Sequence, residues 1–306
     1  MFDLVVIVDW SGSSTPRAGK DSIWSCVHDT RSDERAVANH LTRWAAREHL
    51  EQLLISAADR SVLLGFDFSY AYPAGTSAAA GLAGTTPWSA MWDHLAVHVV
   101  DDARNRNNRF EVAAELNARI SAGHGPFWGA PPRRAGESLS AKKAPGFAHP
   151  IAAGELAEFR ITERRFLDAG LRVASTWQLL GAGSVGSQSL TGIPVVRHLH
   201  HHPALRQRSR VWPFDTGFVP DPTGGRAGAI VHAEIWPGSI PLDTSLHEVR
   251  DAAQVIGLCR HLAGLDRTGE LASFFTPEIS ATERAIALAE EGWILAAPPA
   301  TPARGG

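Results

Sequence analysis

The chain of 306 residues has little cysteine and no long apolar run. Its two cysteines, Cys26 and Cys259, lie far apart and form no Cys-x-x-Cys pair. This excludes a structural zinc site built from thiolates and fits a reducing compartment. No apolar stretch approaches the roughly 18 residues of a membrane helix, and the short apolar run at the N-terminus lacks the basic residues of a signal peptide. We therefore expect a soluble cytoplasmic protein that has no membrane partner.

The chain also lacks a large excess of charge of either sign. Its 29 Lys and Arg residues oppose 32 Asp and Glu residues, so the net charge is -3. No global basic field marks a nucleic-acid-binding protein, although a local basic groove would not show in this sum. The length is sufficient for a substantial core, either as one large α/β domain or as a smaller domain with an insertion.

Two apolar runs end in the same way, with an aspartate, an aromatic residue and a serine. Residues 5–11 read Val-Val-Ile-Val-Asp-Trp-Ser, and residues 62–69 read Val-Leu-Leu-Gly-Phe-Asp-Phe-Ser. Each run predicts a buried strand, and the segment between them includes a helical pattern over 42–58. Neighbouring strands would bring Asp9 and Asp67 to one edge of a sheet. Divalent-metal sites of α/β proteins are usually built in this way.

Two further acids belong to the same hypothesis. Glu234 lies near the end of a predicted strand over 229–236, and Asp251 shares a face with apolar Val255 in a predicted helix over 245–263. A buried carboxylate needs a cation or several donors, and clustered carboxylates favour Mg²⁺ or Mn²⁺. We therefore predict a metal site of Asp9, Asp67 and Asp251, with Glu234 as a further catalytic acid. A helix cap, a turn or a surface salt bridge remains an open alternative for Glu234 and Asp251.

The order of these elements resembles a known family. The resembling segments are residues 8–11, 65–68, 234–237 and 251–253. They are similar to segments of bacterial and archaeal proteins described as predicted nucleases of RNase H-like fold. The resemblance implies a mixed α/β sheet with flanking helices, and metal-binding roles for Asp9, Asp67, Glu234 and Asp251. In place of the carboxylate on the first helix of typical RNases H, the sequence offers Glu48 or Glu51.

The pattern along the chain divides it into a core, an insertion and a tail. Residues 1–73 and 171–296 are predicted to form the RNase H-like core, which includes strands over 171–180 and 211–214. Residues 74–170 are predicted to be a largely helical insertion or lid, with helices over 87–102, 109–120 and 155–168. A short helix is predicted over 281–291, and residues 297–306, rich in Pro, Ala and Gly, are predicted to be a disordered tail.

Hydroxyl and basic side chains near the two aspartates are candidates for substrate contacts. We predict that Ser11, Lys20 and Ser69 bind substrate. Further basic residues that could contact phosphates lie in the insertion, namely Arg133, Arg134, Lys142 and Lys143. Exposed basic residues are more often simply solvated, so this alternative remains open.

Two other motifs compete with the metal-site hypothesis. Residues 181–186 read Gly-Ala-Gly-Ser-Val-Gly and follow an apolar run, as in dinucleotide-binding turns. The acid expected about 20 residues later is missing, and Pro194 interrupts the helix that should follow, so a Gly-rich turn or a phosphate-contacting loop is favoured. The histidine-rich segment 198–202 could bind a metal, but adjacent histidines do not all face one ion, which favours a solvated loop.

These observations predict a metal-dependent phosphodiester hydrolase that uses Mg²⁺ or Mn²⁺. Its substrate would be a nucleic acid or a small nucleotide, and the acidic balance and tryptophan content favour a small or single-stranded one. Two alternatives stay open. One is an ATP-dependent phosphotransferase of the actin-like or sugar-kinase-like type, suggested by the turns at Asp9 and Asp215. The other is a non-catalytic binding or accessory protein. The sequence does not determine the oligomeric state.

Overall fold

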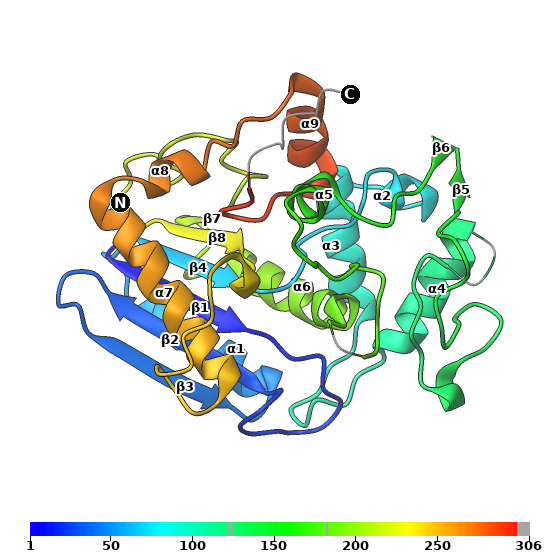
Figure 1. Cartoon of the computed structure of the whole chain (residues 1–306), viewed down its shortest axis with the longest axis horizontal. Coiled ribbons are helices and arrows are strands. Elements are labelled where there is room, and N and C mark those ends of the chain that lie inside the picture. The colour runs from blue at the N-terminus through cyan, green and yellow to red at the C-terminus, as the bar shows by residue number, and fades with distance from the viewer. Residues whose placement is uncertain (122, 124, 153, 182, 299–306) are drawn as a thin grey trace.

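A computed structural model describes residues 1–121, 123, 125–152, 154–181 and 183–298. Within these residues, a six-stranded mixed sheet has helices on both faces (Figure 1). Its strand order is β3-β2-β1-β4-β8-β7. The strands are β1 (Leu4–Asp9), β2 (Ile23–Asp29), β3 (Arg35–His40), β4 (Val62–Phe66), β7 (Ser209–Val211) and β8 (Ile230–Glu234). This confirms the α/β class predicted from the sequence.

Pairing changes from antiparallel to parallel at β1. β1, β2 and β3 pair antiparallel in sequence order, whereas β1 pairs parallel with β4, and β4 pairs parallel with β8. The connection from the hairpin to β4 runs through α1 (Arg43–Ser56), where the Thr42 side chain accepts a hydrogen bond from the backbone of Ala45. Because β1 and β4 run in the same direction, the residues that end them meet at one edge of the sheet.

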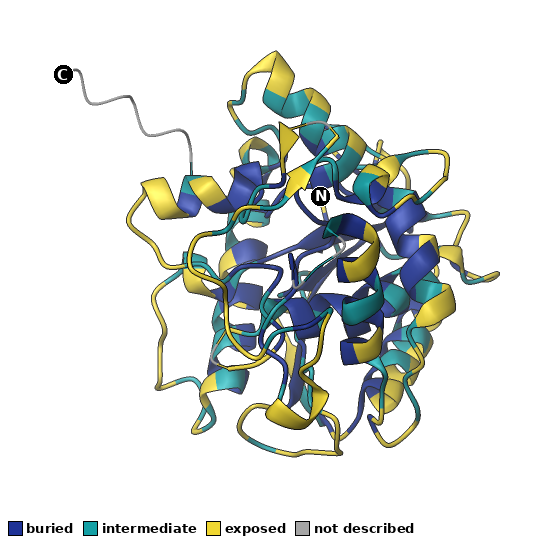
Figure 2. Ribbon diagram, turned by 90° about the vertical axis from the view of Figure 1, so that its right-hand side faces the viewer, coloured by how far each residue is buried: buried dark blue, intermediate teal, exposed yellow. Residues whose placement is uncertain are grey.

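The central strands are apolar on both sides because both faces of the sheet are covered. In β1, Val6 and Val8 pack into the cluster that includes α1, α3 (Pro87–His98) and α6 (Val185–His201). Val5 and Ile7 pack into the cluster on the other face, beneath α7 (Arg250–Thr268). Figure 2 shows this arrangement as buried strands inside a shell of helices whose outer sides are exposed. Strands of this kind read as continuous apolar runs, as residues 4–8 do.

The remaining elements lie mainly between β4 and α6 and after α7. They are α2 (Thr76–Ala79), α4 (Arg109–Ser121), η1 (Pro132–Arg134), β5 (Pro150–Ile151), β6 (Gly154–Glu155), α5 (Ile161–Asp168), η2 (Pro237–Ser239), α8 (Leu271–Phe274), α9 (Ala281–Ile286) and the π-helical η3 (Ala287–Glu291). In the described part of the chain, no helix is long and apolar enough to cross a membrane.

The described residues of the predicted insertion, 74–170, pack onto the sheet. Leu116 of α4 and Phe127 belong to the same hydrophobic cluster as Val6 and Leu64 of the central strands. In Figure 1, α2, α3 and α4 lie on the side toward which the arrowheads of β1, β4 and β8 point. The role of this segment as a lid stays a prediction. From residue 299 onward, the predicted disordered tail lies outside the described residues.

The predicted strand over 171–180 is wrong. The described backbone there forms turns and a single bridge between Gln178 and Trp128. Trp177 is fully buried, but its ring packs against Tyr72 and Phe127 of the preceding segments and not within a sheet. An apolar run indicates burial, and burial alone does not distinguish a strand from a packed turn.

Several boundaries also differ from the prediction. The last long helix begins at Arg250 and not at Ser245, because the Ser245 hydroxyl donates to the Asp243 carboxylate instead of capping the helix. The predicted helix over 155–168 begins only at Ile161, and the strand predicted over 211–214 is β7, which ends at Val211. The edge strand β3 was not predicted, because its exposed residues lack a clear apolar alternation.

Candidate functional site

Asp9 and Asp67 lie side by side at the edge of the sheet. Asp9 is the last residue of β1, and Asp67 follows the last residue of β4. Side chains alternate along a strand, so both point to the face covered by α7, as Ile7 and Leu63 do. The Asp9 and Asp67 carboxyl groups are close enough to interact as hydrogen-bond partners when one of them is protonated. The Trp10 backbone N–H donates to Asp67 Oδ1 over 2.7 Å and so fixes its position.

Burial makes this pair of acids reluctant to ionise. Burial, followed by the charges of Asp67 and Asp251, raises the pKa of Asp9 well above its ordinary value. Burial also raises the pKa of Asp67 to about 7, despite the hydrogen bond from the Trp10 backbone. Both carboxyl groups are partly buried, and their contact favours retention of a proton, since neighbouring negative charges repel one another. A bound cation would remove this penalty.

Asp251 and Asp21 lie at the same cavity. Asp251 is in the first turn of α7, where Oδ2 accepts a hydrogen bond from the Asp21 backbone N–H over 2.6 Å. Burial raises the pKa of Asp251, with a smaller opposing effect from the Arg250 and Lys20 charges. Asp21 was missed in the sequence, because a single acid in a polar hairpin turn carries no distinguishing pattern.

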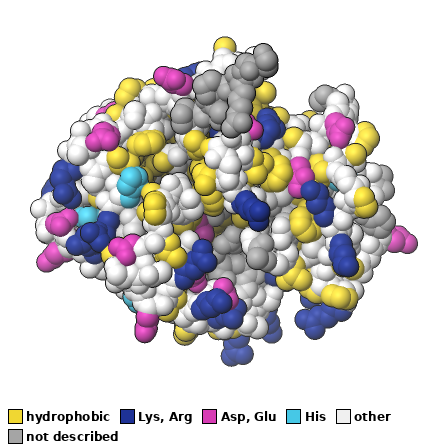
Figure 3. All heavy atoms as spheres, in the orientation of Figure 1, with side chains coloured by type: hydrophobic (Ala, Val, Ile, Leu, Met, Phe, Trp, Pro, Cys, Tyr) yellow, Lys and Arg dark blue, Asp and Glu magenta, His cyan; other side chains and the backbone are white. Residues whose placement is uncertain are grey.

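The cavity has a volume of about 780 Å³ and contains three of the predicted catalytic residues, Asp9, Asp67 and Asp251. Figure 3 shows that this face of the molecule is hollowed near its middle, with Lys and Arg side chains around the hollow. The cavity is also lined by a fourth acid, Asp21, by Ser11, Trp236 and the first turn of α6, and by three arginines, Arg109, Arg172 and Arg250. It therefore combines a negative end with several cationic side chains.

The donor set suits a cation held by two carboxylates. Among the described residues, no group of three or more His, Cys, Asp or Glu side chains is close enough together to hold a metal ion. Asp9 and Asp67 are in contact, whereas Asp251 lines the same cavity without joining them as a third ligand. Mg²⁺ in proteins is commonly bound through one or two carboxylates, with waters and substrate phosphates as the other ligands. The Asp9–Asp67 pair fits this pattern.

Glu234, expected to join these acids, makes different contacts. Its register partner in β4 is Phe66 and not Asp67, so its side chain lies on the opposite face of the sheet. There it forms a buried ion pair with Arg160, whose Nη1 donates to Oε2 over 2.8 Å, and it also accepts from the Tyr70 backbone. Its carboxylate oxygens are therefore already used by an internal cation and a backbone amide. Glu234 does not line the large cavity, but it lines a small cavity of about 30 Å³ together with Asp67. Its role as a further catalytic acid stays a prediction.

The predicted substrate-binding residues lie in different places. Ser11 lines the large cavity, and its hydroxyl donates to the Asp21 carbonyl over 3.3 Å. Ser69 is buried and donates to Glu163, beside a small cavity of about 30 Å³ that Asp67 also lines. Lys20 is exposed and is not part of the large cavity lining, although its charge acts on Asp251. Only Ser11 is thus positioned to contact a molecule in the large cavity.

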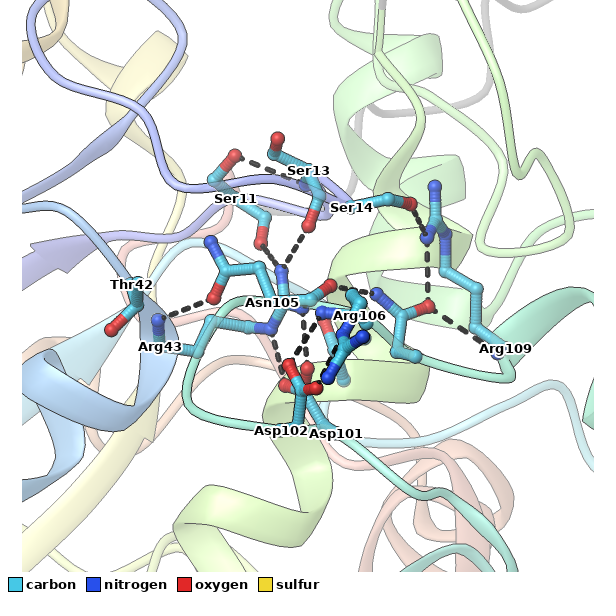
Figure 4. A network of polar contacts seen from close by, with 12 residues as sticks. Ser11, Ser13, Ser14, Thr42, Arg43, Asp101, Asp102, Asn105, Arg106 and Arg109 are labelled. Atoms are coloured by element: carbon cyan, nitrogen blue, oxygen red, sulfur yellow. Dashed lines mark hydrogen bonds and ion pairs between the residues drawn. The ribbon is translucent and has the colours of Figure 1, made fainter.

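The loop after β1 is fixed by a buried arginine (Figure 4). Arg43 of α1 is 1% exposed, and its Nη1 donates to the carbonyl oxygens of Ser11 and Ser13 over 2.8 and 2.7 Å. Its Nη2 donates to Asp101 over 2.6 Å and to the Asn105 carbonyl over 3.1 Å. Through Arg43, α1 and the segment after α3 therefore fix the position of the loop after β1, which forms one wall of the cavity.

The Gly-rich and histidine-rich motifs have structural roles in the described residues. A side chain at Gly186 would meet the Thr176 carbonyl at 2.5 Å, so glycine allows the close approach of α6 to this loop. Ala182 of the same motif lies outside the described residues. The histidine segment is helical up to His201, the last residue of α6, and is not a loop. His198 and His202 contact the carboxylate of Glu51 in α1, at 2.8 and 3.4 Å. Glu51 therefore pairs with histidines of α6 and does not line the cavity that contains Asp9 and Asp67.

Two of the four basic residues singled out in the insertion form ion pairs. Lys143 contacts Glu158 at 2.6 Å, and Arg134 contacts Glu111. None of the four lines the large cavity, so the cationic side of the cavity comes from other arginines. In comparisons with known proteins, no family model, curated protein or solved structure matches the chain.

Proposed function

We propose that this chain is a metal-dependent phosphodiester hydrolase that acts on a nucleic acid or a nucleotide. The observation that carries the proposal is the contact between Asp9 and Asp67 in a cavity that also contains arginine side chains. Contact between two partly buried acids is unfavourable for folding alone, because their negative charges repel one another. It becomes favourable when a divalent cation binds between them.

The positions of the acids support an RNase H-like interpretation. One acid ends the first strand of an antiparallel hairpin, another follows the fourth strand, and Asp251 is on a late helix across the same face. This is the arrangement that the resemblance of residues 8–11, 65–68 and 251–253 implies. The RNase H-like assignment remains part of the proposal, together with Mg²⁺ or Mn²⁺ as the cation.

In this proposal Asp9 and Asp67 hold the cation, and Asp251 lies close enough to act through water or substrate. When bound, Mg²⁺ or Mn²⁺ would stabilise negative charge on the phosphoryl group and lower the pKa of a water molecule. Asp9 and Asp67 must first release their shared proton, so metal binding and proton release are linked. Metal affinity should consequently increase with pH.

The other side chains of the cavity suit a nucleotide. Trp236 is held in place by an edge-to-face contact with Phe166, at 4.7 Å between ring centroids. A fixed indole in a cavity is a suitable stacking surface for a base. Arg172 and Arg250 are exposed at the cavity and available for phosphate oxygens. A nucleic acid or nucleotide therefore fits the charge and shape of the site better than an uncharged molecule.

The test is cleavage of single-stranded DNA, RNA and dinucleotides in the presence of Mg²⁺ or Mn²⁺. We expect cleavage by the wild-type chain and its loss in EDTA. Asp9→Asn and Asp67→Asn should each lower the rate by about 100-fold or more, because metal stabilisation of the transition state is worth several kcal/mol. Asp93→Asn is the matched control, since Asp93 contacts Arg197 on the surface and does not line the cavity.

Three results would contradict the proposal. Unchanged cleavage in Asp9→Asn would exclude the metal mechanism whatever the substrate. Metal-dependent hydrolysis of ATP without phosphodiester cleavage would instead favour the phosphotransferase alternative. If the chain binds nucleotides but cleaves none of them in the presence of any metal tested, the non-catalytic alternative is favoured.

A further inference from the structure

The large cavity contains a buried arginine that has no acidic partner. Arg109 begins α4 and is 6% exposed. Its Nε donates to the Ser187 hydroxyl, and its Nη1 donates to the Ser14 hydroxyl and to Asn107 Oδ1, each over 2.8 Å. All three acceptors are neutral. Among the described residues, Arg109 forms no ion pair, in contrast to the equally buried Arg43 and Arg160.

The guanidinium of Arg109 also has an unused donor. Its Nη2 makes no hydrogen bond with any described residue, and the side chain lines the cavity. The nearby acid Asp101 is already bound by Arg43 through both carboxylate oxygens. Burial and the Arg43 charge lower the pKa of Arg109 to about 10. Its guanidinium also lies over the Phe110 ring, at 4.3 Å from the centroid, but this contact supplies no negative charge, so an anion that came close would stabilise the buried cation further.

The surroundings of Arg109 leave one hydroxyl group available as a further donor. Ser187 is in the first turn of α6, where the backbone N–H groups of Val185, Gly186 and Ser187 already donate to carbonyl oxygens, and its own hydroxyl donates to the Leu179 carbonyl. The loop after β1 rests directly on this turn, since a side chain at Gly12 would meet Ser187 Cβ at 2.7 Å. The Ser14 hydroxyl accepts from Arg109 and can still donate its own proton. Figure 4 shows Ser14 and Arg109 pointing toward one another.

We propose that Arg109 and the Ser14 hydroxyl that it contacts form a subsite for the terminal phosphate monoester of the substrate. This inference rests on the proposed function and specifies its substrate class, a short oligonucleotide or dinucleotide that ends in a phosphate. A nearly buried guanidinium is accessible to a chain end, whereas a strand that continues in both directions needs an open groove. A phosphate monoester also carries more charge than an internal diester and accepts several hydrogen bonds at once.

Chain connectivity limits the distance between this subsite and the acid pair. Asp9 and Ser14 are the ends of one six-residue segment, so their Cα atoms lie at most about 17 Å apart at roughly 3.5 Å per residue. The cavity of about 780 Å³ is in the range of sites that enclose small ligands. Arg109, Asp9 and Asp67 line this one cavity, so in the proposal a short oligonucleotide spans from a terminal phosphate at Arg109 to a phosphodiester at the acid pair.

The test measures binding without metal, so that it does not depend on cleavage. Dithymidine dinucleotides with a 5′-phosphate, with a 3′-phosphate and with no terminal phosphate are titrated by calorimetry in EDTA. We expect one of the two phosphorylated forms to bind about tenfold more tightly than the unphosphorylated form, the usual order for one charged hydrogen-bonded contact. Arg109→Gln should reduce this ratio to less than about twofold. Arg119→Gln, on the surface of the same helix, should leave it unchanged.

Equal affinity of the wild-type chain for all three dinucleotides would overturn the subsite, as would an unchanged ratio in Arg109→Gln. If Arg109→Gln does not fold, Ser14→Ala is the second variant, because Ser14 is exposed and its removal should still reduce the ratio about threefold. The two proposals fail separately. Cleavage that depends on Asp9 without a preference for a terminal phosphate would overturn only the subsite. A phosphate preference in EDTA with no cleavage in any metal would overturn only the hydrolase.

Discussion

At the scale of single residues, the contact between Asp9 and Asp67 is a cost to the folded chain. The folded chain retains a proton that the unfolded chain releases near its ordinary carboxyl pKa. In the window between about pH 4 and about pH 7, the folded state therefore binds more protons than the unfolded state, and the free energy of unfolding falls as pH rises. Sites of this kind are retained for function at the expense of stability.

Replacing one acid of the pair should stabilise the metal-free chain. In Asp9→Asn, the amide can still donate a hydrogen bond to Asp67 while the repulsion disappears. We expect the free energy of unfolding in EDTA at about pH 8 to increase by about 1 to 3 kcal/mol, with a weaker dependence on pH. Urea unfolding at several pH values measures this, with Asp93→Asn as the control. If the free energy of unfolding of Asp9→Asn depends on pH in the same way as that of the wild-type chain, Asp9 and Asp67 do not share a proton.

The sequence predicted the residues whose position depends only on a strand end. Asp9 and Asp67 follow similar apolar runs, and parallel pairing of those runs is sufficient to bring them together. Glu234 also ends a strand, but the face of the sheet to which its side chain points depends on the register of β8 against β4. A shift of one residue in register would move the side chain to the other face. Arg109 had no local signal at all. Its importance comes from what lies around it, namely a second arginine, two serines and no free acid.

At the scale of elements, the cavity wall between β1 and β2 depends on side chains and not on backbone pairing. The loop over 11–15 forms no strand or helix, and Arg43 of α1 binds two of its carbonyl groups. Arg43 also forms the ion pair with Asp101, which connects the loop to the segment between α3 and α4. One side chain therefore positions Ser11 and Ser14 relative to the acid pair and to Arg109.

Removing the Arg43 guanidinium should destabilise this wall strongly. Arg43→Met keeps most of the length of the side chain but leaves Asp101 and two loop carbonyl groups without their donor. We expect a loss of about 3 kcal/mol in the free energy of unfolding, typical for breaking a buried ion pair. Arg47→Met on the same helix is the control and should cost less than about 1 kcal/mol, because Arg47 has a cation–π contact with Trp44 and no ion pair among the described residues. Equal losses in the two variants would contradict the proposed role of Arg43.

Elements with a local signal were predicted, and those that depend on distant partners were not. The fully apolar strands β1 and β4 and the capped helix α1 contain their own pattern. Residues 171–180 have a comparable apolar content, yet their neighbours are the aromatic rings of other segments and not strands. β3 has little apolar pattern and is held in the sheet by its pairing with β2.

At the scale of the whole molecule, the cavity is built from two parts that are distant in the sequence. The sheet and α7 contribute the acids, and α4, the 172–187 segment and the loop after β1 contribute the cationic side. The sheet and the second part share a hydrophobic cluster on the α6 face, which includes Val8, Leu116 and Leu190, whereas α7 packs into the cluster on the other face of the sheet. A ligand that binds only the folded cavity should therefore stabilise the whole chain and not one segment.

Mn²⁺ or Mg²⁺ should increase the free energy of unfolding through the acid pair. A ligand present at 100 times its dissociation constant stabilises the folded state by about 2.7 kcal/mol if the unfolded chain does not bind it. We expect stabilisation of this order in calorimetric or urea unfolding, and it should be larger at about pH 8 than at about pH 6, because burial raises the pKa of Asp67 to about 7 and the bound proton competes with the metal. Asp9→Asn should abolish the effect, whereas Asp93→Asn should retain it. Stabilisation that persists in Asp9→Asn, or that is independent of pH, would place the metal elsewhere and remove the physical basis for a cation between these two strands.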